Sequence, residues 1–352
     1  MTMKQLFLVC LLSLHSLVFA QWEPDVKLSR NEVAAALNEN MGQCIAASGS
    51  TLHVVWCDMK NDGQAIYYQR SDDNGATWSA ETRLSRSPGA DTNPLIAVSG
   101  LNVHVVFMRN GDKPDATSYY KHSTDGGKTW GPDVALGVMR WWPGVAVSGN
   151  TVYVSLNDKT PADNSVVYFR CSIDNGQTWM PKQQISNPAV RAKGRCEDPA
   201  ITASGDDVDL VWNDNRDVEP GKGMAVYFRH SGDRGVTWGP ETALTKAPQY
   251  TYFPTIFPSK GNIDVAFGDR SGEHYEVYYT HSGDGGTSWS KALQLTQSTR
   301  GQFYPTIVRD GVNVLLTCFG DGGLKYFHSG DGADQGAAVH VFSDDISEQR
   351  KH

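Results

Sequence analysis

Two carboxylates stand side by side in the sequence, close to an arginine. Glu197 and Asp198 follow Arg195 and Cys196 in one segment. A carboxyl group beside a reacting bond can donate or accept a proton, so we predict acid/base work for Glu197 or Asp198. The alternative is that these carboxylates form local salt bridges with Arg191 or Arg195 and contact no ligand.

Aromatic residues next to an arginine form a second candidate site. Trp141 and Trp142 follow Arg140. Exposed indole rings beside a guanidinium group predict a surface on which a sugar ring stacks, although one of the two tryptophans can instead be buried between repeats. Tyr252 and Tyr304 are further candidates because each stands one or two residues before a proline that opens a predicted strand. Either tyrosine can equally be part of the protein wall around a channel and contact no ligand.

Other charged residues recur at one place in several repeats, which favours a structural role. Asp214 and Asp269 each follow an apolar strand segment, with Arg216 and Arg270 close behind them. We expect most of these residues to cap strands or pair with one another, and one or two to reach a ligand. Arg216, Arg270 and Arg300 are therefore also candidate ligand contacts. The sequence contains no cluster of histidines that indicates a metal, and we assign no cofactor.

The sequence contains an octet repeated five times, and this repeat indicates the strands that must position these residues. Each copy reads Ser-x-Asp-x-Gly-x-x-Trp, and the copies are residues 71–78, 123–130, 172–179, 231–238 and 282–289. A tyrosine-rich segment that favours a strand precedes each octet and an extended segment follows it. The octet is therefore predicted to be a hairpin turn, in which Ser and Asp bond turn amides, Gly takes a positive φ and Trp adds apolar surface.

The repeat predicts the fold. Successive octets begin 52, 49, 59, 51 and 47 residues apart, the last interval ending at Ser329. Two more strand segments precede each octet, as residues 94–98 and 104–107 illustrate. Four strands in a unit of about 50 residues are typical of propeller blades. We predict an all-β fold, a single six-bladed β-propeller with four-stranded antiparallel blades over residues 21–352.

The last blade needs a strand from elsewhere. The sixth octet lacks its tryptophan and a convincing outer strand, and residues 22–28 match residues 130–136 almost position for position. We therefore predict that the mature N-terminal strand pairs as the outermost strand of the last blade and closes the ring, which removes an exposed edge. The apolar piece at residues 339–342 of the tail competes for the same place.

The first residues predict export. Lys4 precedes an apolar run from Leu6 to Leu17, and residues 18–20 complete the pattern of a secretory signal peptide with cleavage after Ala20. The run is too short to span a membrane, because a spanning helix needs about 20 apolar residues. We therefore expect a secreted or periplasmic protein without a membrane span.

Composition argues against several classes of partner. The formal net charge is −8 and the basic residues are dispersed, so nucleic acid is a poor candidate. Five cysteines remain after residue 20, at wide spacings and without a CxxC pair, which argues against a disulfide framework or a zinc site. We expect a monomer.

The octets are Asp-boxes, and five copies at this spacing make the chain resemble the Asp-box (BNR-repeat) sialidase-like superfamily over essentially its whole mature length. The resemblance implies an active site on the face opposite the Asp-boxes, with three arginines for a substrate carboxylate, a tyrosine nucleophile with a glutamate, and an aspartate as acid/base. Loop position makes Arg140, Arg195 and Arg300 a substitute arginine set, and Tyr304 is a candidate catalytic tyrosine. The family's usual Phe/Tyr-Arg-Ile-Pro is replaced by residues 38–45, which contain no arginine.

The resemblance predicts a secreted carbohydrate-directed, sialidase-like propeller whose partner is a glycan or glycoconjugate. If it is an enzyme, we expect a glycoside hydrolase, an exo-glycosidase acting on sialic or other acidic sugars. The alternative is a non-catalytic propeller that binds a glycan or a protein, which the missing arginine favours. A polysaccharide lyase or a neutral-sugar hydrolase is a further alternative. These functions are distinguished by what the site holds: convergent arginines with a tyrosine, two opposed carboxylates, or neither arrangement.

Overall fold

The computed structural model describes most of the chain. The described residues are 28, 43–60, 63–85, 90–110, 116–138, 141–159, 165–187, 194–216, 223–246, 250–259, 261–270, 272–320, 323–329 and 340–342. The chain forms two units, Met1–Arg30 and Asn31–His352, and only Leu28 of the first unit is described. The predicted signal peptide and its cleavage site therefore lie outside the described residues.

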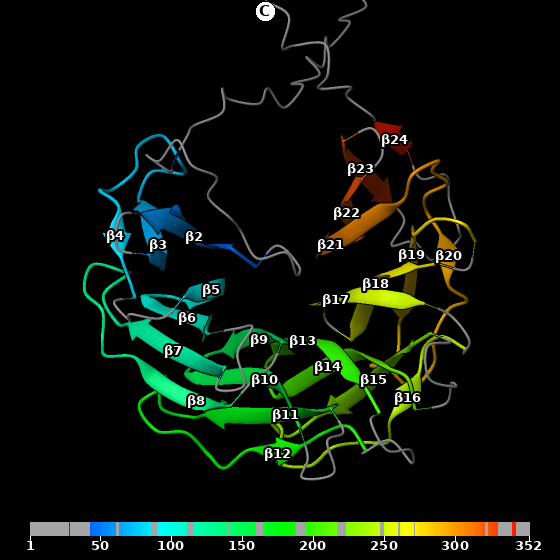
Figure 1. Cartoon of the computed structure of the whole chain (residues 1–352), viewed down its shortest axis with the longest axis horizontal. Coiled ribbons are helices and arrows are strands. Elements are labelled where there is room, and N and C mark those ends of the chain that lie inside the picture. Colours follow the sequence, from blue (N-terminus) through cyan, green and yellow to red (C-terminus); the bar gives the residue numbers. More distant parts are fainter. Residues whose placement is uncertain are drawn as a thin grey trace, which may run out of the picture. The chain divides into compact units, whose positions relative to one another are not determined.

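Every element described in the second unit is a β-strand, and the strands form six antiparallel four-stranded sheets that follow one another in chain order (Figure 1). The first three sheets consist of β1 (Ile45–Ser48), β2 (Thr51–Lys60), β3 (Gly63–Ser71) and β4 (Thr82–Arg83); β5 (Asp91–Ser99), β6 (Asn102–Arg109), β7 (Thr117–Ser123) and β8 (Val134–Val138); and β9 (Trp141–Ser148), β10 (Thr151–Lys159), β11 (Ser165–Ser172) and β12 (Gln183–Gln184).

The other three sheets repeat this arrangement. They consist of β13 (Cys196–Ser204), β14 (Asp207–Asp214), β15 (Ala225–Ser231) and β16 (Thr242–Ala243); β17 (Thr251–Ser259), β18 (Asn262–Asp269), β19 (Glu276–Ser282) and β20 (Leu293–Gln294); and β21 (Gln302–Asp310), β22 (Asn313–Gly320), β23 (Gly323–Ser329) and β24 (His340–Phe342). The prediction of an all-β, six-bladed propeller is confirmed. No helix in the described part of the chain has the length and apolar character needed to cross a membrane.

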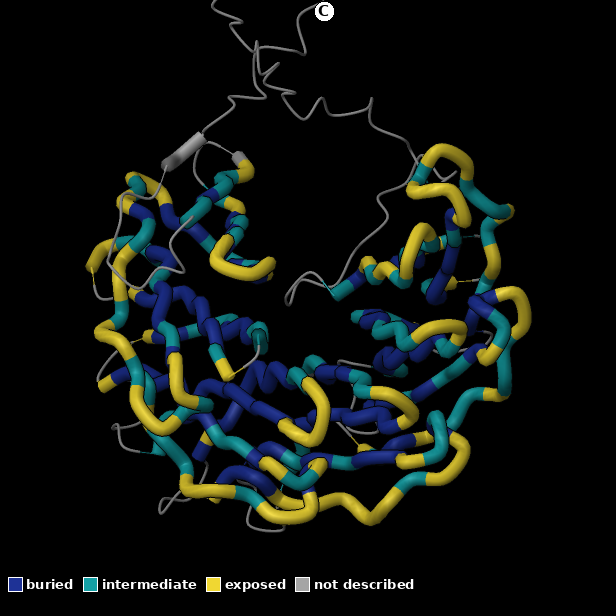
Figure 2. The backbone as a smooth tube through the Cα atoms, turned by 180° about the vertical axis from the view of Figure 1, so that it is seen from behind, coloured by how far each residue is buried: buried dark blue, intermediate teal, exposed yellow. Residues whose placement is uncertain are grey.

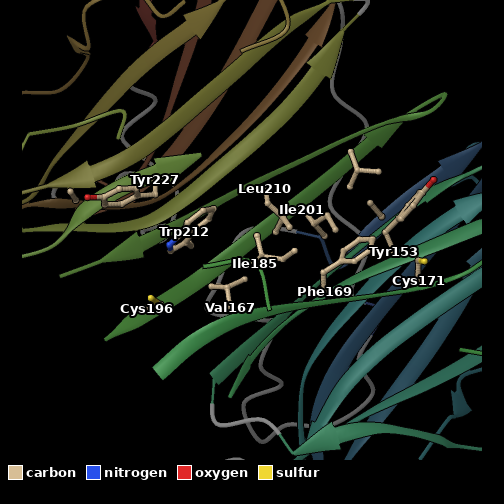
Figure 3. Packing of buried hydrophobic residues seen from close by; sticks show 13 residues of the cluster. Tyr153, Val167, Phe169, Cys171, Ile185, Cys196, Ile201, Leu210, Trp212 and Tyr227 are labelled. Carbon is tan, nitrogen blue, oxygen red and sulfur yellow. The ribbon is translucent and has the colours of Figure 1, made fainter. Parts of the chain in front are cut away.

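The hydrophobic core lies between consecutive sheets. In β6, Val105 and Phe107 pack in a cluster shared with the first sheet, whereas Val106 and Met108 pack in a cluster shared with the third. Successive side chains of a strand point to opposite faces, so a strand buried on both faces reads as a continuous apolar run. Figure 3 shows the equivalent cluster between the third and fourth sheets, and Figure 2 shows buried residues mainly in the strands and exposed ones in the turns.

Each Asp-box holds its own turn by local hydrogen bonds. In the second box the Ser123 hydroxyl donates to Asp125 Oδ1 (2.7 Å) and accepts from the Gly127 N–H (2.8 Å). Asp125 Oδ2 accepts from the Thr129 hydroxyl (2.6 Å). The other four boxes make the same bonds, with Ser288 in place of threonine in the last. The predicted hairpin turn is confirmed.

The Asp-boxes also join neighbouring blades. The Trp130 ring packs edge to face on Tyr68 of the preceding sheet, with 4.9 Å between ring centroids. A Cβ atom added to Gly127 would lie 1.9 Å from the Tyr68 hydroxyl, so only glycine fits there. The third, fourth and fifth boxes pack in the same way on the sheets before them. The tryptophan of the octet therefore has a structural role.

The outermost strand of the last sheet differs from our prediction. That place is taken by β24, which pairs with Tyr326–His328 of β23, whereas we predicted residues 22–28 there. The tail competes better because it follows β23 closely in the chain, and loop-closure entropy costs less for a short connection than for a long one. Residues 22–27 lie outside the described residues, so closure of the ring stays a prediction.

Candidate functional site

A bulge interrupts four inner strands just before their proline. The residue before the proline has a positive φ in each: Asn93 (+51°), Asp198 (+51°), Phe253 (+53°) and Tyr304 (+53°). Pairing slips in register at the same places. Residues other than glycine seldom adopt this conformation, and a bulky residue before proline least of all, so each costs about 1–3 kcal/mol of strain. Strain of this kind gathers at functional sites.

Six part-exposed rings meet around these bulges. We call them the aromatic cluster: Trp142, Tyr252, Phe253, Tyr275, Phe303 and Tyr304. Phe253 lies at its centre, with ring centroids 4.5 Å from Tyr304, 6.0 Å from Tyr252 and 6.4 Å from Trp142. Tyr275 extends it, 5.6 Å from Tyr252 and 5.2 Å from Phe303. Strands β9, β17 and β21 and the segment before β19 thus bring rings together that are far apart in sequence.

Glu197 and Arg195 form an ion pair near the cluster. Arg195 Nε donates to Glu197 Oε1 (2.7 Å), and a second guanidinium nitrogen bonds the same oxygen. The Glu197 side chain is 8% exposed and that of Arg195 57% exposed. Burial raises the pKa of Glu197, and Arg195 opposes this rise. A partly paired carboxyl with a raised pKa can hold and donate a proton.

The hydroxyl of Tyr252 shares this electrostatic environment. Burial raises its pKa most, followed by the charges of Tyr275 and Glu197, whereas Arg195 lowers it. A tyrosine, a glutamate and an arginine from two neighbouring sheets therefore influence one another.

Asp198 lies beneath the cluster and has 2% of its surface exposed. Its Oδ2 accepts a hydrogen bond from the Asn213 amide (2.9 Å) and another from the backbone N–H of Phe253 (3.4 Å). These contacts favour a structural role for Asp198 over contact with a ligand.

Two exposed arginines stand in connections near the cluster, Arg270 directly after β18 and Arg300 shortly before β21. The Arg270 guanidinium lies 5.7 Å from the centroid of the Tyr275 ring. Arg300 is exposed in the connection that packs on Tyr275, because the N–H of Gln302 donates to the Tyr275 carbonyl (2.7 Å). Guanidinium groups in such positions can bind an anionic group of a ligand through charge-assisted hydrogen bonds.

Both the repeat and the fold match known proteins. The family model of the BNR/Asp-box repeat matches residues 69–80, which include the first octet. A solved structure of an ulvan lyase, a polysaccharide lyase, is 13% identical with a TM-score of 0.60, over 88% of this chain and 84% of that chain. The Hadza microbial sialidase is 16% identical with a TM-score of 0.50, over 80% of this chain and 62% of that one. The protein is a six-bladed β-propeller that carries the BNR/Asp-box repeat.

Other neighbours share the fold of this BNR-repeat propeller. An α-L-arabinofuranosidase from Fusarium graminearum in complex with an iminosugar inhibitor is 17% identical with a TM-score of 0.51, over 72% of this chain and 80% of that chain. No curated protein matches the sequence. At these identities the likeness is one of fold, so the function must be argued from the site itself.

The propeller uses Arg216 to hold its fourth blade together. Its guanidinium bonds Asp214 and Glu241 and lies 4.5 Å from the Tyr227 ring centroid, with the side chain 12% exposed. Arg109 makes the equivalent contacts with two carboxylates in the second blade. Asp214 and Arg216 thus pair with each other, as expected for the recurring charges, and Arg216 is engaged within the fold, whereas Arg270 is exposed.

Two predicted site residues lie beyond what the structure can place. Arg140 is outside the described residues, and only the backbone of Trp141 is described, at the start of β9. Trp142, the second residue of the predicted tryptophan pair, reaches the aromatic cluster. Among the described residues, no group of three or more His, Cys, Asp or Glu side chains could hold a metal ion, and the described cysteines are buried and form no disulfide with one another.

Sequence reasoning did not select Phe253, Tyr275 or Phe303 as site residues. Phe253 carried a usable signal, because it precedes Pro254 as Tyr304 precedes Pro305. Tyr275 had none, since its segment follows no repeated pattern, and only the fold brings it against Tyr252.

Proposed function

We propose that this propeller binds an acidic glycan at the aromatic cluster. The observation that carries the proposal is the contact among six part-exposed rings, two of which, Phe253 and Tyr304, stand at strained bulges of inner strands. Aromatic rings stack on the apolar faces of sugars, and a part-exposed ring left at a strained backbone position indicates a binding role over a packing role.

Charge supports an acidic ligand. Arg195, Arg270 and Arg300 are exposed around the cluster, although the whole chain has a formal net charge of −8. A carboxylate or a sulfate on the sugar would find charge-assisted donors there. The ulvan lyase neighbour has also been solved bound to -[GlcA(1-4)Rha3S]-, a ligand that carries both kinds of group.

A second candidate function is cleavage of the bound glycan, which the raised pKa of Glu197 favours. A carboxyl group that keeps its proton above the usual pH range can donate it to the departing glycosidic oxygen. Glu197 also shares its surroundings with Tyr252 and Arg195. A propeller that binds the glycan without cleaving it has the same aromatic cluster, but no reaction takes up the Glu197 proton.

Binding is tested by titrating the purified protein with sialyllactose, with a uronic acid oligosaccharide and with lactose, followed by calorimetry. We expect an acidic sugar to bind more tightly than lactose. Trp142→Ala and Tyr304→Ala should each weaken binding about tenfold, which corresponds to the loss of one stacking contact. Trp289→Ala is the matched control, because it removes a tryptophan of an Asp-box and should reduce stability but not affinity. Equal binding of all three sugars, or none, contradicts the proposal.

Cleavage is tested separately with Glu197→Gln, which keeps the shape of the side chain and removes its proton. If Glu197 is the acid, this variant binds the glycan and does not cleave it. New reducing ends without ultraviolet absorbance identify a hydrolase, and an absorbing unsaturated uronate identifies a lyase. Unchanged turnover in the variant rules out this role for Glu197.

We also propose that the protein acts outside the cytoplasm. The support is the pattern of Lys4, the apolar run and Ala20 at the start of the sequence. Sequencing the N-terminus of the protein exported by its own cell should find Gln21 first, and an N-terminus that retains residues 1–20 contradicts this proposal.

A further inference from the structure

The buried carboxylate of Asp198 joins two neighbouring blades. Asp198 lies in β13. It accepts a hydrogen bond from the backbone N–H of Phe253, which lies in β17. Phe253 is the bulged residue of its strand, and a bulge leaves the N–H of the extra residue without a partner in the ladder. This N–H is partly buried and needs an acceptor, and Asp198 Oδ2 supplies it.

The corresponding contact between the third and fourth sheets takes a different form. Asn157 of β10 and Asn213 of β14 occupy equivalent places, and the Asn157 amide bonds the Cys196 carbonyl of the next sheet directly. The Asn213 amide instead donates to Asp198 of its own sheet (2.9 Å), while the Thr251 hydroxyl of the next sheet donates to Asn213 Oδ1 (3.2 Å). Asp198 thus lies within a buried polar network that spans both sheets.

The other residues at this bulge position are neutral: Asn93, Phe253 and Tyr304. Only Asp198 among these four bulged residues is acidic, and it accepts a hydrogen bond from the backbone N–H of Phe253, whose ring lies at the centre of the aromatic cluster. The Phe253 ring contacts Trp142, Tyr252 and Tyr304, so a shift of its backbone moves the surface that these four rings form.

We infer that Asp198 is a positioning residue: it holds Phe253 in its left-handed conformation and thereby sets the geometry of the aromatic cluster. This role differs from the acid/base role that the sequence predicted for Asp198. The consequence for binding rests on the proposed glycan site, whereas the hold on Phe253 does not.

Two substitutions separate the effect of the carboxylate from the effect of the backbone conformation. Asp198→Asn keeps an acceptor and tolerates a positive φ, whereas Asp198→Gly keeps the positive φ and removes the acceptor. Asn93→Gly is the matched control, since it makes the same change at the bulge of β5, where the Asn93 amide donates to the sulfur of Met108 in its own sheet. All variants are made in the full chain.

The first readout is hydrogen–deuterium exchange of the peptide that contains Phe253. Asp198→Gly should exchange about tenfold faster there, as expected for loss of one hydrogen bond to a charged group, while Asp198→Asn and Asn93→Gly stay near the wild type. The second readout is affinity for sialyllactose and for a uronic acid oligosaccharide. Asp198→Gly should weaken it about tenfold and Asp198→Asn should stay within about threefold.

The outcomes distinguish the two proposals. Unchanged exchange and affinity in Asp198→Gly overturn the positioning role. Normal exchange with loss of turnover in Asp198→Asn identifies Asp198 as a catalytic acid and also overturns it. If the wild type binds no glycan, the proposed function fails, and the exchange experiment still decides whether Asp198 holds Phe253.

Discussion

Arg309 of the last sheet forms a buried two-point ion pair with Asp264 of the sheet before it. Its Nε lies 2.5 Å from Asp264 Oδ2 and an Nη 2.6 Å from Oδ1, and the side chains are 4% and 0% exposed. Tyr279 also donates to Asp264 (2.6 Å) and occupies the position in its sheet at which Tyr68 meets an Asp-box tryptophan. The sixth octet has no tryptophan, so the ion pair takes over this inter-blade contact.

Removing Arg309 should destabilise the propeller strongly. Arg309→Met leaves Asp264 buried without its cation, which costs about 3–5 kcal/mol of unfolding free energy. The double variant Arg309→Met with Asp264→Leu removes both charges and should recover most of the loss. Urea denaturation measures both variants. Equal destabilisation of the single and double variants contradicts this account.

Glycines with a positive φ should differ in cost according to what lies beside them. A Cβ at Gly176 would stand 1.9 Å from the Tyr120 hydroxyl, whereas Gly149 has nothing within 4 Å. Gly149→Ala should cost about 1–2 kcal/mol from backbone strain alone. Gly176→Ala adds a clash between blades and should lower the melting temperature further. Thermal unfolding of the two variants compares them directly, and equal shifts would show that the packing on Tyr120 is loose.

The Asp-box carboxylates should resist protonation. The Thr237 hydroxyl, its N–H and the Ser231 hydroxyl lower the pKa of Asp233 from 3.8 to about 2. Because the folded pKa lies below the unfolded value, the stabilisation is complete above pH 3.8 and is lost as the pH falls through about 2. Thr237→Val should raise the pKa of Asp233 in an NMR titration. The pKa of Asp73, about 2 in its own box, is the internal control and should stay in place.

Glu197 should behave in the opposite way. Burial raises its pKa above 4.5, so its protonated form favours the fold and this contribution is lost as the pH rises through the folded pKa. If Glu197 is a catalytic acid, turnover falls over the same range. Arg195→Gln removes the charge that lowers the pKa of Glu197 and should move its titration to higher pH in carbon-detected NMR. The exposed Lys246→Gln is the control, and an unmoved titration in Arg195→Gln contradicts the coupling.

The repeat and the blade count could be predicted from the sequence because the interactions behind them are local. Within an Asp-box, Ser172 bonds Asp174 and Gly176, all inside one octet. The strand before each octet and the spacing of about 50 residues then define a blade. The prolines of the inner strands also indicated Tyr252 and Tyr304 as candidates.

The candidate site depended on contacts between distant segments. Glu197 and Asp198 are adjacent in sequence, yet the bulge buries Asp198 under Phe253 and leaves Glu197 beside the exposed side chain of Arg195. Arg216 is engaged by Glu241, which stands 25 residues later. Sequence spacing could not distinguish the partly buried, paired Arg216 from the exposed Arg270.

By itself, the sequence determined the repeating unit, its turns and the all-β class, because the hydrogen bonds of each turn join residues of a single octet. The tertiary structure decided which rings meet, which carboxylate is buried and that β24 completes the last sheet. The first two outcomes depend on how neighbouring blades pack, since they bring together residues tens of positions apart whose contact no local pattern records. The third depends on the short connection between β23 and β24.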